Sequence, residues 1–241
     1  MEVYLLEAKD ADTRTVTAQD IKYGIALEMD LWLDLTSIQI GTPEIWEHYR
    51  EIPGGEIIDL TEFTGRVEYK RRPLTITASR TEDYKDWINH LNKIMLKLHG
   101  KKFHILLGDD ETHFYTGRCK VSSTKDNPVI SDYVLEFTCN PTRHILPPID
   151  VMFKDIQTGL TNATNSYWIN LYVGQHASAL TVTFEKVVSS SAARMNVETS
   201  GEETRTIQLE NQPFFLPYSG NVRIGLQNVK TFSLSMENKE L

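Results

Sequence analysis

Three consecutive carboxylates, Asp109, Asp110 and Glu111, are the first side chains in the sequence that could bind a metal or act as acid and base. They lie between two apolar runs, so we expect them at the tip of a β-hairpin, where side chains are solvated. Adjacent carboxylates converge on one atom only if a loop folds them inward. The sequence therefore favours a charged turn over a catalytic or metal-binding cluster.

The histidines show no metal-ligand spacing such as His-Glu-x-x-His. They are His48, His90, His99, His104, His113, His144 and His176. His104 and His113 fall on opposite arms of the predicted hairpin, where a metal pair is conceivable, but no further ligands accompany them. We therefore expect scattered surface or half-buried histidines and no metal site.

The two cysteines, Cys119 and Cys139, fall on predicted strands, where cysteine usually packs as a small hydrophobic residue. A cysteine nucleophile would need a base and an oxyanion site, and nothing in the sequence indicates either. The sequence also lacks a phosphate-binding glycine loop, a Gly-x-Ser-x-Gly elbow and a Rossmann fingerprint. We therefore predict no catalytic residue, no cofactor and no enzymatic activity.

Composition narrows the classes of partner. The chain has 241 residues, of which 40% are hydrophobic, and a net charge of −8. Specific nucleic-acid binding is not expected, because phosphate contacts need a basic face. No apolar run is long enough to cross a membrane, and the acidic N-terminus does not resemble a signal peptide. Two cysteines do not form a disulfide scaffold, so synthesis in a reducing cytoplasm is the simplest interpretation.

One amphipathic helix is predicted over residues 81–99. Its apolar stripe consists of Tyr84, Trp87, Ile88, Leu91, Ile94, Met95 and Leu98. Thr81 is expected to cap the first turn, with Ser79 and Glu82 as an alternative capping box, and Gly100 to end the helix. A single helix among strands should lie across a sheet and close one end of a β domain.

Strand patterns occupy much of the remaining chain. Before a proline-containing linker at 144–148 they cover residues 3–8, 66–69, 74–78, 103–107, 114–119 and 129–139. After the linker they cover residues 167–173, 180–186, 194–199, 204–209, 221–226 and 231–236, with a turn at 200–202. We therefore predict a mainly β (α+β) protein with two domains, residues 1–144, which carry the helix, and residues 145–241, a β-sandwich.

Short motifs follow one another between residues 23 and 141. They are Tyr23-Gly24-Ile25, Gly41-Thr42-Pro43-Glu44, Ile52-Pro53-Gly54-Gly55, Ile58-Asp59-Leu60-Thr61, residues 67–74, Leu98-His99-Gly100, residues 103–107, Asp109-Asp110, Tyr115-Thr116-Gly117-Arg118 and residues 137–141. In this order they resemble the distal tail protein family of long-tailed phages and prophages. Residues 213–224 add a thinner match. Gly55-Glu56 replaces the family's usual Asp-Gly, and Arg71 stands where an asparagine is common.

The resemblance implies a virion structural protein that acts as a baseplate hub of a long non-contractile tail. Family members form a hexameric ring, single or stacked, through an N-terminal β-sandwich or split-barrel domain, and carry a C-terminal galectin-like β-sandwich. The ring connects the tail tube protein to the tail-associated fibre or lysin protein, and some relatives hold receptor-binding proteins. We accordingly expect synthesis in the host bacterial cytoplasm and a location at the virion tail tip, with a role in host adsorption.

Physical arguments add detail to such a ring. The genome must pass through it without binding, so an acidic lumen is expected, because carboxylates repel phosphate over about a Debye length. Rings close by contacts between different patches of neighbouring subunits. Open sheet edges near residues 66–69 or 129–139, and the loop at 52–61, are the predicted contact segments.

Two other functions remain open. The C-terminal sandwich contains Tyr167, Trp168 and Tyr172, which could stack on host cell-wall glycans as a carbohydrate-binding module, although aromatic residues in a sandwich more often belong to the core. The other is a cytoplasmic hydrolase, for which the sequence offers no paired carboxylates. We rank the structural tail component ahead of both.

Overall fold

The computed structural model describes residues 2–8, 16–46, 49–51, 57–59, 67–108, 110–146, 149–153, 167–175, 181–186, 192–199, 204–210 and 220–241. The chain is mainly β, as predicted. It forms two compact units, Met1–Lys9 with Ala18–Arg143 and Asp10–Thr17 with His144–Leu241. The assignment of residues 1–144 to a ring-forming domain and of residues 145–241 to a separate sandwich domain stays a prediction.

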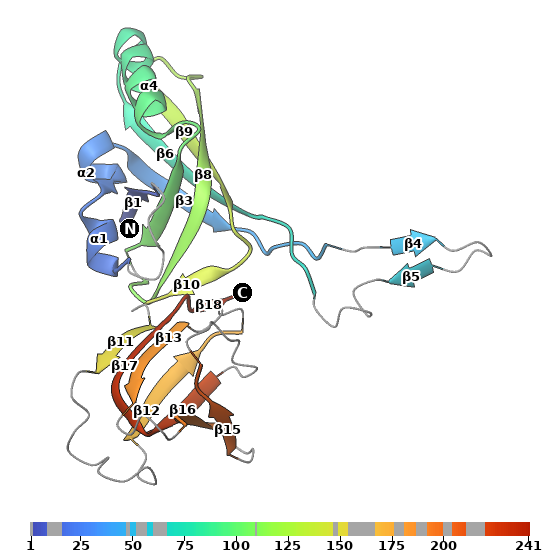
Figure 1. Ribbon diagram of the computed structural model, residues 1–241. Helices are drawn as coiled ribbons and strands as arrows, with labels where there is room; N and C mark the ends of the chain where they lie inside the picture. Colours follow the sequence, from blue (N-terminus) through green and yellow to red (C-terminus); the bar gives the residue numbers. More distant parts are fainter. Residues whose placement is uncertain are drawn as a thin grey trace. The chain divides into compact units, whose positions relative to one another are not determined.

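One antiparallel sheet dominates the first unit (Figure 1), with the strand order β2-β1-β7-β8-β9-β6-β3. The strands are β1 (Val3–Glu7), β2 (Ile25–Ala26), β3 (Asp34–Ile40), β6 (Arg72–Thr81), β7 (Lys102–Leu107), β8 (His113–Thr124) and β9 (Ile130–Cys139). In the described residues they are accompanied by the helices α1 (Ala18–Lys22), α2 (Leu27–Leu31) and α4 (Tyr84–Leu98). Strands β4 (Tyr49–Glu51) and β5 (Ile57–Asp59) form a separate two-stranded ladder.

Alternation along β9 shows why this segment is a strand. Its Tyr133, Leu135 and Phe137 side chains are buried, while Asp132 and Glu136 are exposed. The register places the buried residues opposite Leu74, Ile76 and Ala78 of β6, so the two strands cover one core together. A period of two with one apolar face is the pattern expected of a sheet with one solvated side.

The prediction of an open sheet edge at residues 129–139 is wrong. β9 lies between β8 and β6 and is hydrogen-bonded on both sides, from Arg72↔Cys139 to Thr81↔Ile130 along β6. The alternation of apolar and polar residues shows which face of a strand is buried, but it does not show which strands lie beside it. Residues 67–70 pair with residues 44–46 through the bridge between Tyr69 and Ile45, and Arg66 lies outside the described residues.

Helix α4 begins three residues later than predicted. The N-cap is Asp83, whose backbone is extended and whose Oδ1 accepts a hydrogen bond from the Asp86 N–H at 2.8 Å. Thr81 instead ends β6 opposite Ile130. Gly100 has φ +77°, which confirms the predicted left-handed stop.

Only part of the predicted apolar stripe of α4 is covered. Ile94 and Leu98 are buried in the core of the sheet, and Trp87 and Leu91 pack against it. Tyr84 remains 64% exposed. The two short helices α1 and α2 were not predicted, because five residues are too few to show helical periodicity.

In the part of the second unit that the structure describes, the strands form two antiparallel sheets, β11-β17-β13 and β12-β16-β14-β15. The strands are β11 (Ile149–Phe153), β12 (Tyr167–Val173), β13 (Thr181–Lys186), β14 (Arg194–Thr199), β15 (Arg205–Gln208), β16 (Gly220–Gln227) and β17 (Val229–Met236). Both sheets contribute alternate residues to one core, including Val182, Met195, Val197, Val222, Ile224, Leu226, Phe232 and Leu234. This is the arrangement of a β-sandwich.

Further parts of the second half bear on the sequence predictions. The predicted turn at 200–202 and the linker prolines at 147–148 lie outside the described residues. The short strands β10 (Arg143–Ile145) and β18 (Lys239–Glu240), and β11, were not predicted. The six strands predicted after the linker are present, with their ends shifted by two residues at most.

Asp83→Ala should destabilise the first unit by about 1 kcal/mol, because the helix loses its N-cap hydrogen bond. Thr81→Ala is the matched control, since Thr81 is the cap that the sequence suggested. Urea unfolding measures both. Equal losses for the two variants, or a larger loss for Thr81→Ala, would contradict the assignment of the cap.

Candidate functional site

A buried polar cluster beneath α4 is the first place where the structure brings ionisable side chains together. Tyr133 donates a hydrogen bond to Glu82 Oε1 at 2.5 Å, and Arg80 Nε lies 3.2 Å from Glu82 Oε2. His90 Nδ1 is 3.1 Å from the Tyr133 hydroxyl, and His90 Nε2 is 2.8 Å from the carbonyl oxygen of Leu31. The cluster therefore connects β6, α4, β9 and α2.

The backbone of Glu82 is held as firmly as its side chain. Its N–H donates to the carbonyl of Val129 at 2.8 Å, and its carbonyl accepts from Lys125 Nζ at 2.7 Å. Sequence reasoning assigned Glu82 to the helix terminus and missed this role. The alternation of buried residues in β6 could have indicated this role. It passes from Ile76 and Ala78 to Arg80 and continues to Glu82, just after the strand.

The cluster is a structural feature of the fold, because its central groups are buried and a substrate cannot reach them. Tyr133 is fully buried, and the Glu82 side chain is 2% exposed. Burial and the hydrogen bond to Glu82 raise the pKa of Tyr133, so it remains a donor. Burial, followed by the nearby Arg80 charge, lowers the pKa of His90, which is therefore largely neutral at pH 7.

The hairpin histidines do not form a metal pair. His104 is buried opposite Thr116, and its Nδ1 lies 2.9 Å from Thr116 Oγ1. His113 Nδ1 lies 3.0 Å from Asp110 Oδ2 instead. Within the described residues, no group of three or more His, Cys, Asp or Glu side chains could hold a metal ion. His48 and His176 lie outside that part of the chain.

The carboxylates at the hairpin tip form a turn. Asp110 Oδ1 accepts hydrogen bonds from the Thr112 N–H at 3.0 Å and from the Thr112 hydroxyl at 2.5 Å. Burial opposes ionisation of Asp110, but the hydrogen bonds from Thr112 and then His113 outweigh it and lower its pKa. Glu111 pairs with Lys22, and Asp109 lies outside the described residues. Asp110 therefore fixes the turn locally, and Glu111 connects the turn to Lys22 of α1.

The cysteines are poor nucleophiles. Cys119 and Cys139 are free and buried in the core of the main sheet. Burial raises the pKa of each thiol to about 12, so the thiolate is scarce at neutral pH. Their packing role agrees with the sequence prediction.

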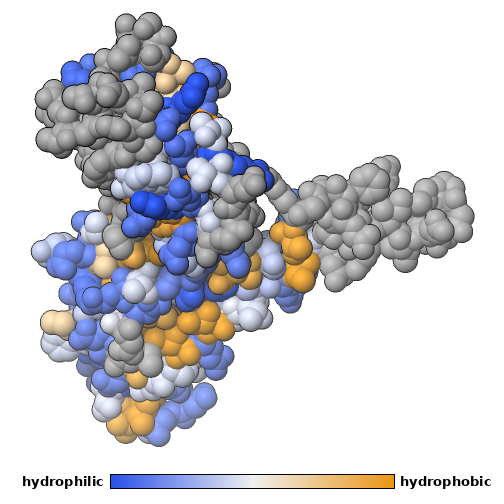
Figure 2. Space-filling model, turned by 90° about the horizontal axis from the view of Figure 1, so that it is seen from below, coloured by the Kyte–Doolittle hydropathy of each residue, from blue (hydrophilic) through white to orange (hydrophobic). Residues whose placement is uncertain are grey.

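A two-stranded ribbon, formed by residues 44–46 and 67–70, exposes apolar side chains. Its backbone is joined by Trp46 N–H to Glu68 O and by Lys70 N–H to Glu44 O, both at 2.7 Å. Ile45 is 52% exposed, Trp46 50% and Val67 48%. On the face drawn in Figure 2, hydrophobic residues gather in separate patches on a mainly hydrophilic surface. Exposed apolar groups of this kind are typical of binding surfaces.

No helix in the described part of the chain is both long enough and apolar enough to span a bilayer. Two surface features of the described residues are candidates for a function, the ribbon of residues 44–46 and 67–70 and the outward faces of the sheets. Neither offers an arrangement of acid, base and nucleophile.

Tyr133→Phe should destabilise the protein by about 1–3 kcal/mol, because it removes a hydrogen bond and leaves Glu82 buried with fewer donors. Tyr84→Phe, on the exposed side of α4, is the control and should change stability little. Thermal or urea unfolding measures the difference. Similar stabilities for the two variants would show that the cluster does not hold the helix to the sheet.

His104 should make stability fall in mild acid. Burial, with a smaller effect of Lys102, lowers its pKa from 6.5 to about 4 in the folded chain. Between these values the unfolded chain binds a proton that the folded chain excludes, so stability is present above pH 6.5 and is lost as the pH falls. The expected loss at this histidine between pH 7 and 5 is about 2 kcal/mol.

Urea unfolding of the unmodified chain and His104→Gln at both pH values isolates this contribution. The pH dependence should shrink by about 2 kcal/mol in the variant, whatever its absolute stability. NMR titration of the imidazole in the unmodified chain gives the pKa independently. An ordinary pKa near 6.5 would contradict the prediction.

Comparison with solved structures gives a similarity of fold. No protein-family model and no curated protein sequence matches the chain. The crystal structure of SPP1 Dit (gp 19.1), described as a paradigm of the hub adsorption apparatus in phages that infect Gram-positive bacteria, matches with a TM-score of 0.54 at 14% identity. The match covers 99% of both chains. The chain therefore has the fold of SPP1 Dit.

Proposed function

We propose that this protein is a structural component of a long non-contractile phage or prophage tail, which forms a hexameric ring at the distal end of the tail tube. The observation that carries the proposal is the similarity of fold to SPP1 Dit over 99% of both chains. The ordered motifs between residues 23 and 141 point to the same family. A fold alone does not assign a function, so the surfaces must supply the rest of the argument.

The β4–β5 ladder supports assembly. Each of its strands has three residues, and within the described residues they pair only with each other. An isolated two-stranded hairpin is marginally stable in water. Packing against a neighbouring subunit would supply the missing stabilisation. The predicted contact segment at 52–61 overlaps this ladder, although residues 52–56 and 60–61 lie outside the described part.

The ribbon of residues 44–46 and 67–70 and strand β3 provide further contact surface. The exposed Ile45, Trp46 and Val67 side chains adjoin the ladder in sequence. β3 pairs with β6 on one side and ends the described strand order, so its outer edge is available for pairing with another chain. This edge takes the place of the one predicted at residues 129–139.

A hub has partners on both sides of its ring. The proposed partners are the tail tube protein on one side and the tail-associated fibre or lysin protein on the other, with a receptor-binding protein as a further candidate. The net charge of −8 suits a lumen through which DNA passes without binding. The proposed location is the virion tail tip, after synthesis in the host cytoplasm.

The proposed function is structural assembly without catalysis. Tyr133 and Glu82 are buried, and the Cys119 and Cys139 thiols have a raised pKa. These properties do not favour the alternative hydrolase. The carbohydrate-binding alternative rests on a different surface, which is treated below.

The purified chain should form rings with about six times its mass of 27.6 kDa, alone or with the tail tube protein. The double variant Ile45→Asp with Trp46→Asp should lower the mass towards that of a single chain, because buried carboxylates in the subunit contact would be unpaired. Light scattering and negative-stain images measure this. Leu96→Asp, at an exposed position on α4, is the control and should keep the ring.

A chain that stays monomeric at every concentration, with and without the tail tube protein, would overturn the proposal. Rings that survive in the double variant would leave the hub intact but exclude the ribbon from the subunit contact.

A further inference from the structure

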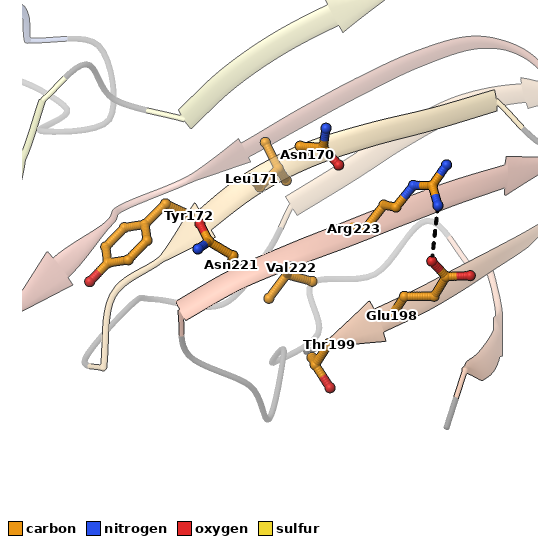
Figure 3. Close-up of a pocket in the computed structure, with 8 residues that line it drawn as sticks. All are labelled: Asn170, Leu171, Tyr172, Glu198, Thr199, Asn221, Val222 and Arg223. Carbon is orange, nitrogen blue, oxygen red and sulfur yellow. Dashed lines mark hydrogen bonds and ion pairs between the residues drawn. The ribbon is translucent and has the colours of Figure 1, made fainter. Parts of the chain in front are cut away.

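The outward face of the β12-β16-β14-β15 sheet carries a row of polar side chains. The register places Asn170 of β12 opposite Arg223 of β16, and Arg223 opposite Glu198 of β14. Figure 3 shows these three residues side by side on neighbouring strands. Residues of the opposite parity, such as Val222 and Ile224, belong to the core. The row is therefore a consequence of register between segments that are distant in sequence.

The guanidinium of Arg223 is held in place from two sides. Its Cζ lies 4.3 Å from the centre of the Trp168 ring, and its Nη1 lies 3.3 Å from Glu198 Oε2. Gly225 makes this possible, because a Cβ there would come within 2.8 Å of Trp168 Cζ3. The indole can therefore lie over β16 and support the arginine. The stacking and the ion pair restrict the rotamers of this half-exposed arginine before any ligand binds.

Further hydrogen-bonding groups surround this arginine. Asn170 and Asn221 are exposed, and each carries a side-chain amide that can donate and accept hydrogen bonds. Tyr172 lies beside Asn221 and is 49% exposed. These residues line a shallow hollow of about 510 Å³ (Figure 3). Its volume is in the usual range for small-ligand sites, roughly 300–1,000 Å³.

The chemistry of the hollow suits a sugar. A pyranose offers hydroxyl groups that donate and accept, and an apolar C–H face. Arg223 and the two amides provide donors, Glu198 and the amide oxygens provide acceptors, and Tyr172 provides an aromatic ring. An anionic ligand fits less well, because the cation is already paired with a carboxylate. An apolar ligand would leave the polar row unsatisfied.

We propose that this face of the sheet, centred on Arg223, binds neutral pyranose units of a polysaccharide. Glu198 and Trp168 position Arg223, while Arg223, Asn170, Asn221 and Tyr172 contact the sugar. Trp168 and Tyr172 are aromatic residues that the sequence offered for sugar stacking, and the structure places Tyr172 at the surface rather than in the core. The side chain of Tyr167 is outside the described part. The site does not depend on ring assembly.

The intact chain should bind on an array of bacterial cell-wall and capsular polysaccharides, and methyl pyranosides should identify the sugar by ligand-observed NMR. Arg223→Met keeps the aliphatic stem on Trp168 but removes the donors, and Tyr172→Ala removes the ring. Each should weaken binding by about tenfold or more. Thermal unfolding of each variant checks that the fold is kept.

Lys230→Met is the matched control. Lys230 forms an ion pair with Glu185 on the other sheet at 3.3 Å, the same distance as the Arg223–Glu198 pair. This control should bind sugar within about twofold of the unmodified chain. Backbone amide shifts of the unmodified chain should change on sugar addition mainly in β12, β14 and β16.

Three results would overturn the proposal. The first is no binding of any neutral polysaccharide or of the methyl pyranosides at millimolar concentration. The second is binding that Arg223→Met and Tyr172→Ala leave unchanged. The third is binding of phosphate-rich or acidic polymers only. None of these results would affect the ring, whose mass is measured separately.

Discussion

The buried carboxylate of Glu82 is the contact on which the architecture of the first unit depends. A charged group in the core is costly unless it is paired and hydrogen-bonded. Tyr133 donates a hydrogen bond to Oε1, Arg80 supplies the opposite charge beside Oε2 without forming a hydrogen bond, and Val129 and Lys125 hold the backbone. Because these groups come from β6, β9 and the segment between β8 and β9, they fix where the chain leaves the sheet and enters α4. The position of the helix thus follows from a polar contact as much as from its apolar stripe.

Much of the fold could be predicted from local patterns. Alternation along residues 129–139 indicated a strand with Tyr133 and Phe137 on one face, and the structure confirms it. Gly100 marked the end of α4 correctly. The central position of β9 could not be predicted, because a strand's own sequence shows its buried face but does not identify its neighbours. The N-cap was assigned to the wrong residue because Thr81 and Asp83 are both good capping residues, and only the length of β6 decides between them.

The polar face of the second unit is harder still to predict, because it depends on which strands are neighbours and in which register they pair. Asn170, Glu198 and Arg223 are distant in sequence and carry no motif. Three adjacent strands in a specific register bring them into one row. The sequence showed Trp168 and Tyr172 as aromatic residues on a predicted strand that alternate with Ile169 and Leu171. Both faces of this strand carry apolar residues, so only the packing of the second sheet decides that Ile169 and Leu171 face the core. The first unit thus exposes an apolar ribbon, and the second exposes a polar sheet face.

The buried thiols of Cys119 and Cys139 have a consequence for a protein that would be made inside a cell and used outside it. Oxidants and disulfide exchange act on the thiolate, and both groups are shielded and protonated in the core of the sheet. Exposure to air should therefore neither form disulfides between copies of the chain nor oxidise Cys119 and Cys139 in its core. Oxidation in air should instead affect exposed methionines such as Met29, which is 73% exposed.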